Sequence, residues 1–128
     1  MTALPPFAGV LGVSVEAGAE GAPVLVMPFG DAVVGRPGFL HGGALAGLLE
    51  MAAIAGVQHA LAADGGGRVK PINVTVDFRR GGRAKDTRAV GVVTRLGTRV
   101  ANVDAVAWQD QRDQPIAAAR FNFLVWRE

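Results

Sequence analysis

The sequence contains no cysteine, and only 19% of its 128 residues are charged. Without cysteine the chain can form neither disulfides nor thiolate zinc sites, which fits a reducing compartment and a cytoplasmic protein. Hydrophobic residues make up 50% of the chain, so a packed core is expected and disorder is not. A chain of this length has room for one core, and we expect a single domain over residues 1–128.

Targeting and membrane signals are not evident. The N-terminal stretch MTALPPFAGVLGV has no basic lead, and Pro5 and Pro6 interrupt its apolar residues, so no signal peptide is expected. The run from Gly43 to Ala63 is about as long as the ~20 apolar residues that cross a bilayer. It carries Glu50 and two further polar residues in its middle, each costly in lipid, so we expect no membrane span.

The same run, Gly43 to about Ala63, is the one long helical candidate. Ala, Leu and Met form helices readily, and Asp64 followed by three glycines provides a natural stop. Its apolar residues surround most of the helix rather than forming one stripe, which predicts a helix that is buried on most sides.

Strand patterns stand on both sides of this helix. Before it, alternating apolar residues at Leu11, Val13 and Val15 and again at Val24 and Val26 predict a hairpin. After it, four strands are predicted, and their polar separators GGRAKD, LGTR and QDQRDQP suit hairpin turns between antiparallel strands. Their ranges are Ile72–Phe78, Arg88–Leu96, Val100–Trp108 and Ile116–Trp126.

Together, the predicted helix and strands indicate an α+β fold, an antiparallel sheet of five to six strands wrapped around one long central helix. No internal repeat or low-complexity segment interrupts this order. A single open sheet leaves an edge strand without a partner, so pairing with a second copy of the chain is expected.

Glu50 is the one acid in the helical run. A carboxylate in apolar surroundings is costly unless it is hydrogen-bonded or paired. One interpretation is structural, with Glu50 bonded to a neighbouring backbone group or to an arginine. The other is chemical, because a buried carboxylate without a cation is suited to act as a general base.

The helix begins with His41, Gly42 and Gly43. The first amides of a helix are unpaired donors at the positive end of its dipole, which suits a carbonyl oxygen that gains charge. From Gly42 to Glu50 is eight residues, or ~12 Å of helix rise. A donor and a base that serve one carbonyl must each lie within about 3 Å of the reacting atoms, so they cannot meet within one chain. If both act in one reaction, Glu50 must come from a second subunit.

The stretch HGGALAGLLE, within this order of elements, resembles the hotdog-fold acyl-CoA thioesterases, in particular the phenylacetate-pathway (PaaI-like) branch. That family carries His-Gly-Gly followed, nine positions after the His, by Asp or Glu, here His41 and Glu50. The resemblance runs over nearly the whole chain from about Pro6. VKPINVTVDFRR matches the strand after the helix, and residues 89–125 match the closing strands.

This resemblance implies hydrolysis of an acyl-CoA thioester in a homodimer or a dimer of dimers, that is, a homotetramer. The backbone N–H of Gly42 would polarise the thioester carbonyl. Glu50 of the partner subunit would act as nucleophile or as base toward water, and His41 would orient the loop. No metal or cofactor is implied, since CoA is part of the substrate.

Two positions depart from the family pattern. The family usually has Asn or Gln six residues before the His, where this chain has Gly35, and a polar residue one turn after the acid, where it has Ile54. Either Asp31 or Arg36 substitutes, or catalysis is weaker, or the substrate differs.

Five basic residues fall within ten positions: Arg79, Arg80, Arg83, Lys85 and Arg88. Such a cluster indicates first a solvated turn and second a site for a phosphate-bearing ligand. Nucleic acid is not expected, because Phe78 is the one aromatic residue beside the cluster and stacking needs several. With the resemblance, the CoA phosphates become the expected ligand of the first three arginines. The other expected substrate contacts are Gly43, Asn73 and Thr75.

Two further hypotheses concern the same fold. Gly35 suggests a hotdog domain that binds acyl thioesters without turnover, and a hotdog enoyl-CoA hydratase or dehydratase would use an acid and a histidine together. His59 lies on the opposite helix face from Glu50, so no shared metal site is predicted. Asp77 and Asp104 are expected to face solvent, and both tryptophans to pack in the core or an interface.

Overall fold

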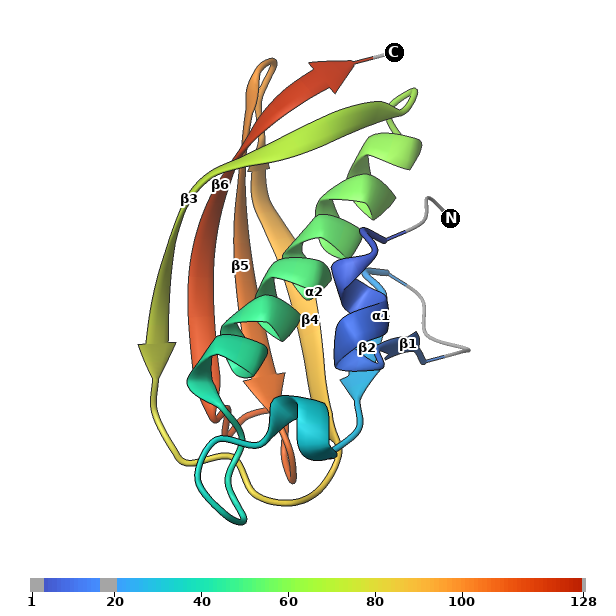
Figure 1. The fold of residues 1–128 in the computed structure, drawn as a ribbon. Helices are drawn as coiled ribbons and strands as arrows, with labels where there is room; N and C mark the ends of the chain where they lie inside the picture. Colours follow the sequence, from blue (N-terminus) through green and yellow to red (C-terminus); the bar gives the residue numbers. More distant parts are fainter. Residues whose placement is uncertain (1–3, 17–20, 128) are drawn as a thin grey trace.

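A computed structural model describes residues 4–16 and 21–127 of the chain. One sheet of six strands curls around the long helix α2, Gly42–Ala62 (Figure 1). The strands are β1 Ser14–Val15, β2 Val24–Met27, β3 Gly67–Phe78, β4 Thr87–Leu96, β5 Val100–Trp108 and β6 Ala117–Arg127. Their spatial order is β1-β2-β4-β5-β6-β3, and every neighbouring pair is antiparallel. The predicted α+β architecture is therefore confirmed.

The helix α2 is the core of the domain, because small and apolar side chains surround it. Leu48 and Leu49 near its middle are fully buried, and most of its other residues are buried as well. By length and composition α2 is able to cross a membrane, but 67% of its apolar window is buried inside the protein. That burial identifies it as a core helix.

Two glycines bring the backbones of α2 and β4 into contact. A Cβ atom added at Gly56 would stand 2.2 Å from the carbonyl oxygen of Gly91, and one added at Gly91 would stand 2.5 Å from the carbonyl oxygen of Ala52. Side chains cannot approach backbone atoms so closely, so both positions require glycine for the helix to lie against the sheet.

The N-terminal hairpin differs in part from its prediction. Leu11, predicted to lie in a strand, ends the short helix α1, Phe7–Leu11. The helix stops at Gly12, whose φ of 71° is the left-handed conformation that ends helices. The predicted pairing itself is confirmed, because β1 pairs with β2, although residues 17–20 of the expected turn lie outside the described residues.

The connection GGRAKD does not form the predicted hairpin. The strand β3 pairs with β6, while β4 pairs with β2 and β5, so the connection passes below the sheet at the end where α2 begins (Figure 1). The reason is burial: the first half of β4 is mostly buried and suits the centre of the sheet, whereas β3 is mostly exposed and suits an edge.

The edge strand β3 turns an apolar face toward the side of α2. Val74 pairs with Phe121, a fully buried core residue, so Val74, Val76 and Phe78 lie on the helix side of the sheet. Along this strand Ile72, Val74 and Phe78 are 52%, 47% and 57% exposed. In the described part of the chain no strand pairs with the outer edge of β3.

Candidate active site at the start of α2

His41 caps the first turn of α2. Its backbone is extended, with φ −70° and ψ 132°, and its Nδ1 accepts a hydrogen bond from the N–H of Gly43 at 2.9 Å. Because Nδ1 is the acceptor, the neutral ring carries its proton on Nε2. A Cβ atom added at Gly43 would lie 2.9 Å from the same imidazole ring. The second glycine of the motif is thus required by the histidine cap.

Gly42 is the first residue of α2, where a backbone N–H has no acceptor within the helix. Among the described residues no other group accepts this hydrogen bond. The ring of Phe78 would lie 3.6 Å from a Cβ atom at Gly42. Both residues line a hollow of about 340 Å³, together with Leu40, Leu45, Arg79, Arg80, Gly81 and Gly82. The unpaired amide therefore borders an open space.

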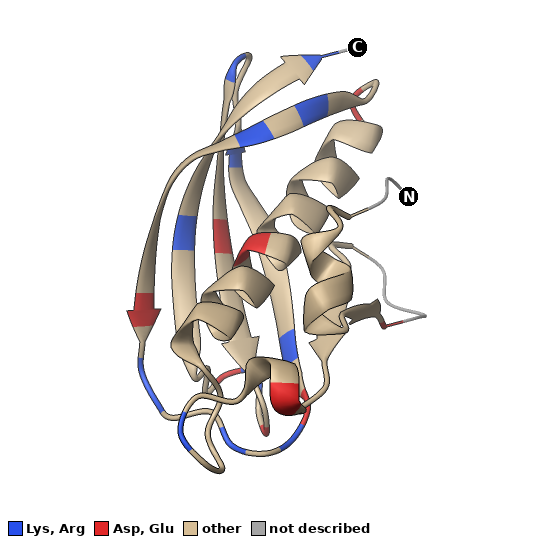
Figure 2. Cartoon of the chain, viewed as in Figure 1, with Lys and Arg blue, Asp and Glu red and all other residues tan. Residues whose placement is uncertain are grey.

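Glu50 lies two turns further along α2, on nearly the same side as Gly43. It is half-buried and is the only charged residue of α2, apart from any charge on His59 (Figure 2). No described residue forms an ion pair or a hydrogen bond with its carboxylate. The structural interpretation, in which a backbone group or an arginine satisfies Glu50, is thus not met in the described part of the chain.

One unbroken α-helix contains both Gly42 and Glu50. Its rise of ~12 Å over eight residues keeps the amide and the carboxylate apart within a single chain. The two groups can therefore act on one carbonyl only across two copies of the chain.

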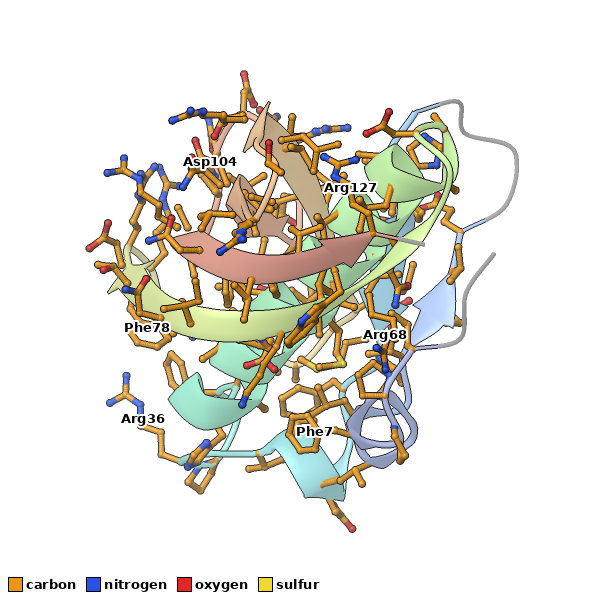
Figure 3. All side chains as sticks on the ribbon, turned by 90° about the horizontal axis from the view of Figure 1, so that it is seen from above. Phe7, Arg36, Arg68, Phe78, Asp104 and Arg127 are labelled. Atoms are coloured by element: carbon orange, nitrogen blue, oxygen red, sulfur yellow. The ribbon has the colours of Figure 1, made fainter. Side chains whose placement is uncertain are left out.

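Asn73 and Thr75 do not join this site. Their strand turns its apolar residues toward α2, so both polar side chains lie on the opposite face of the sheet. There Asn122 donates to Asn73 at 2.7 Å and accepts from Asn102 at 2.5 Å. Thr75 and Asp104 line a cavity of about 310 Å³ on that face. Figure 3 shows Asp104 and Phe78 on opposite sides of the sheet. This corrects the expectation that both residues contact the substrate.

The five basic residues separate into two groups. Lys85 pairs with Asp110 at 2.5 Å, and Arg88 pairs with Glu16 at 3.0 Å, so their charges are compensated. The others make no ion pair with any described residue, and these are the three expected to bind the substrate: Arg79, Arg80 and Arg83.

Gly35 lies in a tight loop before the helix. Its N–H donates to the carbonyl oxygen of Phe39 at 2.9 Å, and a Cβ atom there would lie 3.1 Å from the Cα atom of His41. No Asn or Gln fits at this position without movement of the loop. Asp31 is exposed, and Arg36 stacks on the ring of Phe39.

The remaining candidates are consistent with structural roles. His59, Asp77 and Asp104 are exposed, as predicted, and Asp104 lies 3.7 Å from Arg120. Within residues 4–16 and 21–127, no three His, Cys, Asp or Glu residues gather as a metal site would require. Trp108 is buried, whereas the other tryptophan is exposed.

Phe39 and Phe78 lie beside the site without a sequence signal that assigns them to it. Phe78 reads as one more apolar position of its strand, although it covers Gly42. Phe39 lies in a loop of little regular structure, and its bridge to Arg83 joins segments far apart in the sequence. Only the folded chain brings these aromatic rings to the start of α2.

Comparison with known proteins gives a family match that covers the site. The family model of the thioesterase superfamily matches residues 37–116, a range that contains the His-Gly-Gly start, Glu50 and the basic cluster. A solved thioesterase-superfamily protein is 31% identical, with a TM-score of 0.77, over 95% of this chain and 90% of its own. No curated protein sequence matches the chain.

Two other solved structures share the fold. A thioesterase from Haemophilus influenzae is 20% identical, with a TM-score of 0.81, over 94% of this chain and 82% of its own. A phenylacetic acid degradation-related protein from Ralstonia eutropha is 24% identical, with a TM-score of 0.80, over 96% of this chain and 92% of its own. The predicted hotdog fold is thereby confirmed.

Proposed function

This chain belongs to the thioesterase superfamily, and we propose that it hydrolyses an acyl-CoA thioester to a carboxylic acid and free CoA. The observation that carries the proposal is a pair of unsatisfied groups on α2. Within the described residues, the N–H of Gly42 has no acceptor and the carboxylate of Glu50 has no cation. Acyl transfer needs an oxyanion donor and an activated oxygen, and these two groups supply both without a metal or a cofactor.

A second copy of the chain completes the proposed site. The edge of β3 is open, and its exposed residues Ile72, Val74 and Phe78 are apolar. Phe78 also covers Gly42, so a copy that pairs along β3 approaches the start of α2. In a two-fold dimer of this kind, the partner's Glu50 meets Gly42, and two equivalent sites form. A dimer of dimers would repeat the same site.

The proposed reaction begins with attack of water on the thioester carbon, while Glu50 of the partner subunit accepts a proton from that water. The carbonyl oxygen gains negative charge and accepts a hydrogen bond from the N–H of Gly42. Collapse of the tetrahedral intermediate breaks the C–S bond, and the proton held by Glu50 passes to the departing CoA sulfur. In the nucleophilic route a Glu50 oxygen attacks the thioester carbon, the C–S bond breaks and CoA leaves as a thiolate that takes a proton from solvent. Water then cleaves the mixed anhydride, which releases the carboxylic acid and restores Glu50. Both routes require an ionised Glu50.

His41 and the arginines have supporting roles in this proposal. His41 holds the first turn of α2 through Gly43 and so orients the amide of Gly42. Arg79 and Arg80 border the hollow next to that amide, and their uncompensated charges favour the CoA phosphates.

The test is hydrolysis by a Glu50→Gln variant, measured as thiol release from aromatic, short-chain and long-chain acyl-CoAs. Loss of a general base or nucleophile is expected to lower kcat about 10²- to 10⁴-fold, because water is no longer activated. Circular dichroism of the variant checks that it folds. Full activity of Glu50→Gln across the panel would remove the carboxylate from the mechanism.

Gly35 favours one second candidate, a domain that binds acyl-CoA without turnover. A side-chain amide at this position would help to place the attacking water, and this chain has a glycine there, in a loop where even a Cβ atom would lie 3.1 Å from the Cα atom of His41. Calorimetry would then detect acyl-CoA binding while the wild-type protein releases no thiol. Thiol release that depends on Glu50 decides for hydrolysis.

A further inference from the structure

Four arginines gather at the end of the molecule where α2 begins, and none makes an ion pair with a described residue. Arg79 and Arg80 border the hollow at Gly42, and Arg36 and Arg83 belong to the loops beside it. Figure 2 shows these loops with their blue segments at the lower end of the molecule. Uncompensated positive charge concentrated in this way attracts an anion.

The guanidinium groups of Arg36 and Arg83 both contact the ring of Phe39, and we call these three residues the arginine stack. The two guanidinium Cζ atoms lie 3.9 Å and 4.4 Å from the centre of the Phe39 ring, so these two atoms are at most about 8 Å apart. A cation–π contact holds a guanidinium without neutralising it, and the N–H donors of the guanidinium stay free. An ion pair such as Lys85 with Asp110 has its charge already compensated.

The backbone under the arginine stack is firmly connected. Phe39 and Arg83 form an antiparallel bridge, and the N–H of Leu40 donates to the carbonyl oxygen of Gly82 at 2.9 Å. The side chain of Gln109 accepts from the N–H of Arg83 at 2.9 Å and donates to its carbonyl oxygen at 3.1 Å. These bonds join loops that are distant in the sequence and preorganise the two guanidinium groups for a ligand.

The arginine stack adjoins the hollow that contains Gly42. Gly81 lines this hollow, and a Cβ atom added at Gly81 would lie 3.0 Å from the Phe39 ring. Figure 3 shows Phe78 and Arg36 at the same end of the molecule, both on the side of α2. A ligand that extends from the hollow past Gly81 therefore reaches the arginine stack next.

We propose that the arginine stack binds a phosphate monoester, which in acyl-CoA is the 3′-phosphate of the nucleotide. The choice of CoA as the ligand rests on the proposed function. A phosphate monoester carries nearly two negative charges at neutral pH and three acceptor oxygens, which match two guanidinium groups. Arg79 and Arg80 at the hollow are left for the pyrophosphate. The adenine base does not stack on Phe39, because the arginines already occupy that ring.

The binding test uses adenosine 3′,5′-bisphosphate as the probe in titration calorimetry. We expect Arg36→Gln to weaken its binding about ten- to a hundredfold, the range for a lost charge-assisted hydrogen bond. Phe39→Leu keeps every charge but removes the platform, and it should also weaken binding. Lys85→Gln makes the same charge change at an ion-paired residue nearby and should stay within about threefold of wild type. Unchanged binding by Arg36→Gln, or equal weakening by Lys85→Gln, would overturn the proposal.

Hydrolysis separates this inference from the proposed function. The wild-type protein is expected to have a KM at least about tenfold lower for an acyl-CoA than for the same acyl-dephospho-CoA, which lacks the 3′-phosphate. Arg36→Gln should lose most of this preference with kcat unchanged, and a preference retained in full contradicts the assignment. If no thioester is cleaved while the bisphosphate binds through Arg36, the phosphate site stands and the proposed function fails.

Discussion

The imidazole of His41 occupies the space that a side chain at Gly43 would need, and its Nδ1 accepts the N–H of Gly43 at 2.9 Å. Cap and glycine are therefore one structural unit at the start of α2. This unit explains the histidine and the second glycine of His-Gly-Gly, because the second glycine makes room for the ring.

The cap makes a prediction about stability. His41→Ala and Gly43→Ala should each lower the free energy of unfolding by about 1 kcal/mol, since the first removes the acceptor at the helix N-terminus and the second displaces its ring. His41→Asn should recover most of this loss, because asparagine is also a good N-cap. Urea denaturation measures all three variants. A Gly43→Ala variant as stable as wild type would show that the cap does not depend on the glycine.

Gly42 permits a substitution that removes one hydrogen. The backbone of His41 is extended, with φ −70° and ψ 132°, as a residue before proline must be, and proline is favoured at the first helical position. Gly42→Pro should therefore fold but lose the N–H donor, which lowers kcat about 10²- to 10³-fold.

Gly42→Ala is the matched control for that variant. It retains the N–H, and its Cβ atom would lie 3.6 Å from the ring of Phe78, an ordinary contact. Its thiol-release rate should stay close to wild type. Equal rates in the proline and alanine variants would argue against an oxyanion donor at Gly42.

The contact between α2 and β4 predicts a large loss of stability. Gly56→Ala would place a Cβ atom 2.2 Å from the carbonyl oxygen of Gly91, and backbone on both sides cannot yield. We expect a loss of about 3 kcal/mol or more in the free energy of unfolding. Gly47→Ala is the control, because its Cβ atom would meet the movable ring of Phe7 at 2.6 Å. If both variants lose the same free energy in urea, the backbone contact is not decisive.

The open edge of β3 predicts how the chain assembles. Val74→Lys places a charge among the exposed apolar residues of that edge, so the dimer should dissociate and thiol release should fall with it. Val92→Lys is the control. Val92 is equally exposed, at 48%, but it lies on β4 and faces away from α2, on the outer face of the sheet. Light scattering gives the mass of each. A Val74→Lys variant that stays dimeric and active would place the interface elsewhere.

The sequence predicts the elements better than their arrangement. For α2, Gly43–Ala63 is predicted and Gly42–Ala62 is observed, because strong helix formers end at a run of glycines. The last three strands are also predicted closely, whereas β3 begins at Gly67, five residues before its predicted start at Ile72. The order of the strands is not predicted, since GGRAKD suits a hairpin equally well as a connection, and the pairing of β3 with β6 depends on which strands the core buries.

The residues of the candidate site also fall into those that the sequence predicts and those that it does not. Gly42 and Glu50 can be predicted because both stand on one helix, where spacing determines distance. The sequence does not reveal which face of β3 meets α2, so it predicts Asn73 and Thr75 at the site although they lie on the other face. The contact of Arg83 with Phe39 is invisible in the sequence, because two distant loops create it.

The most direct test of a site shared between two chains is activity in a mixed dimer of Gly42→Pro and Glu50→Gln, purified through two different tags. Each variant alone should be almost inactive. In the mixed dimer, one of the two sites joins an intact amide to an intact carboxylate, so about half of the wild-type activity should return. A purified mixed dimer as inactive as its parents would contradict the account.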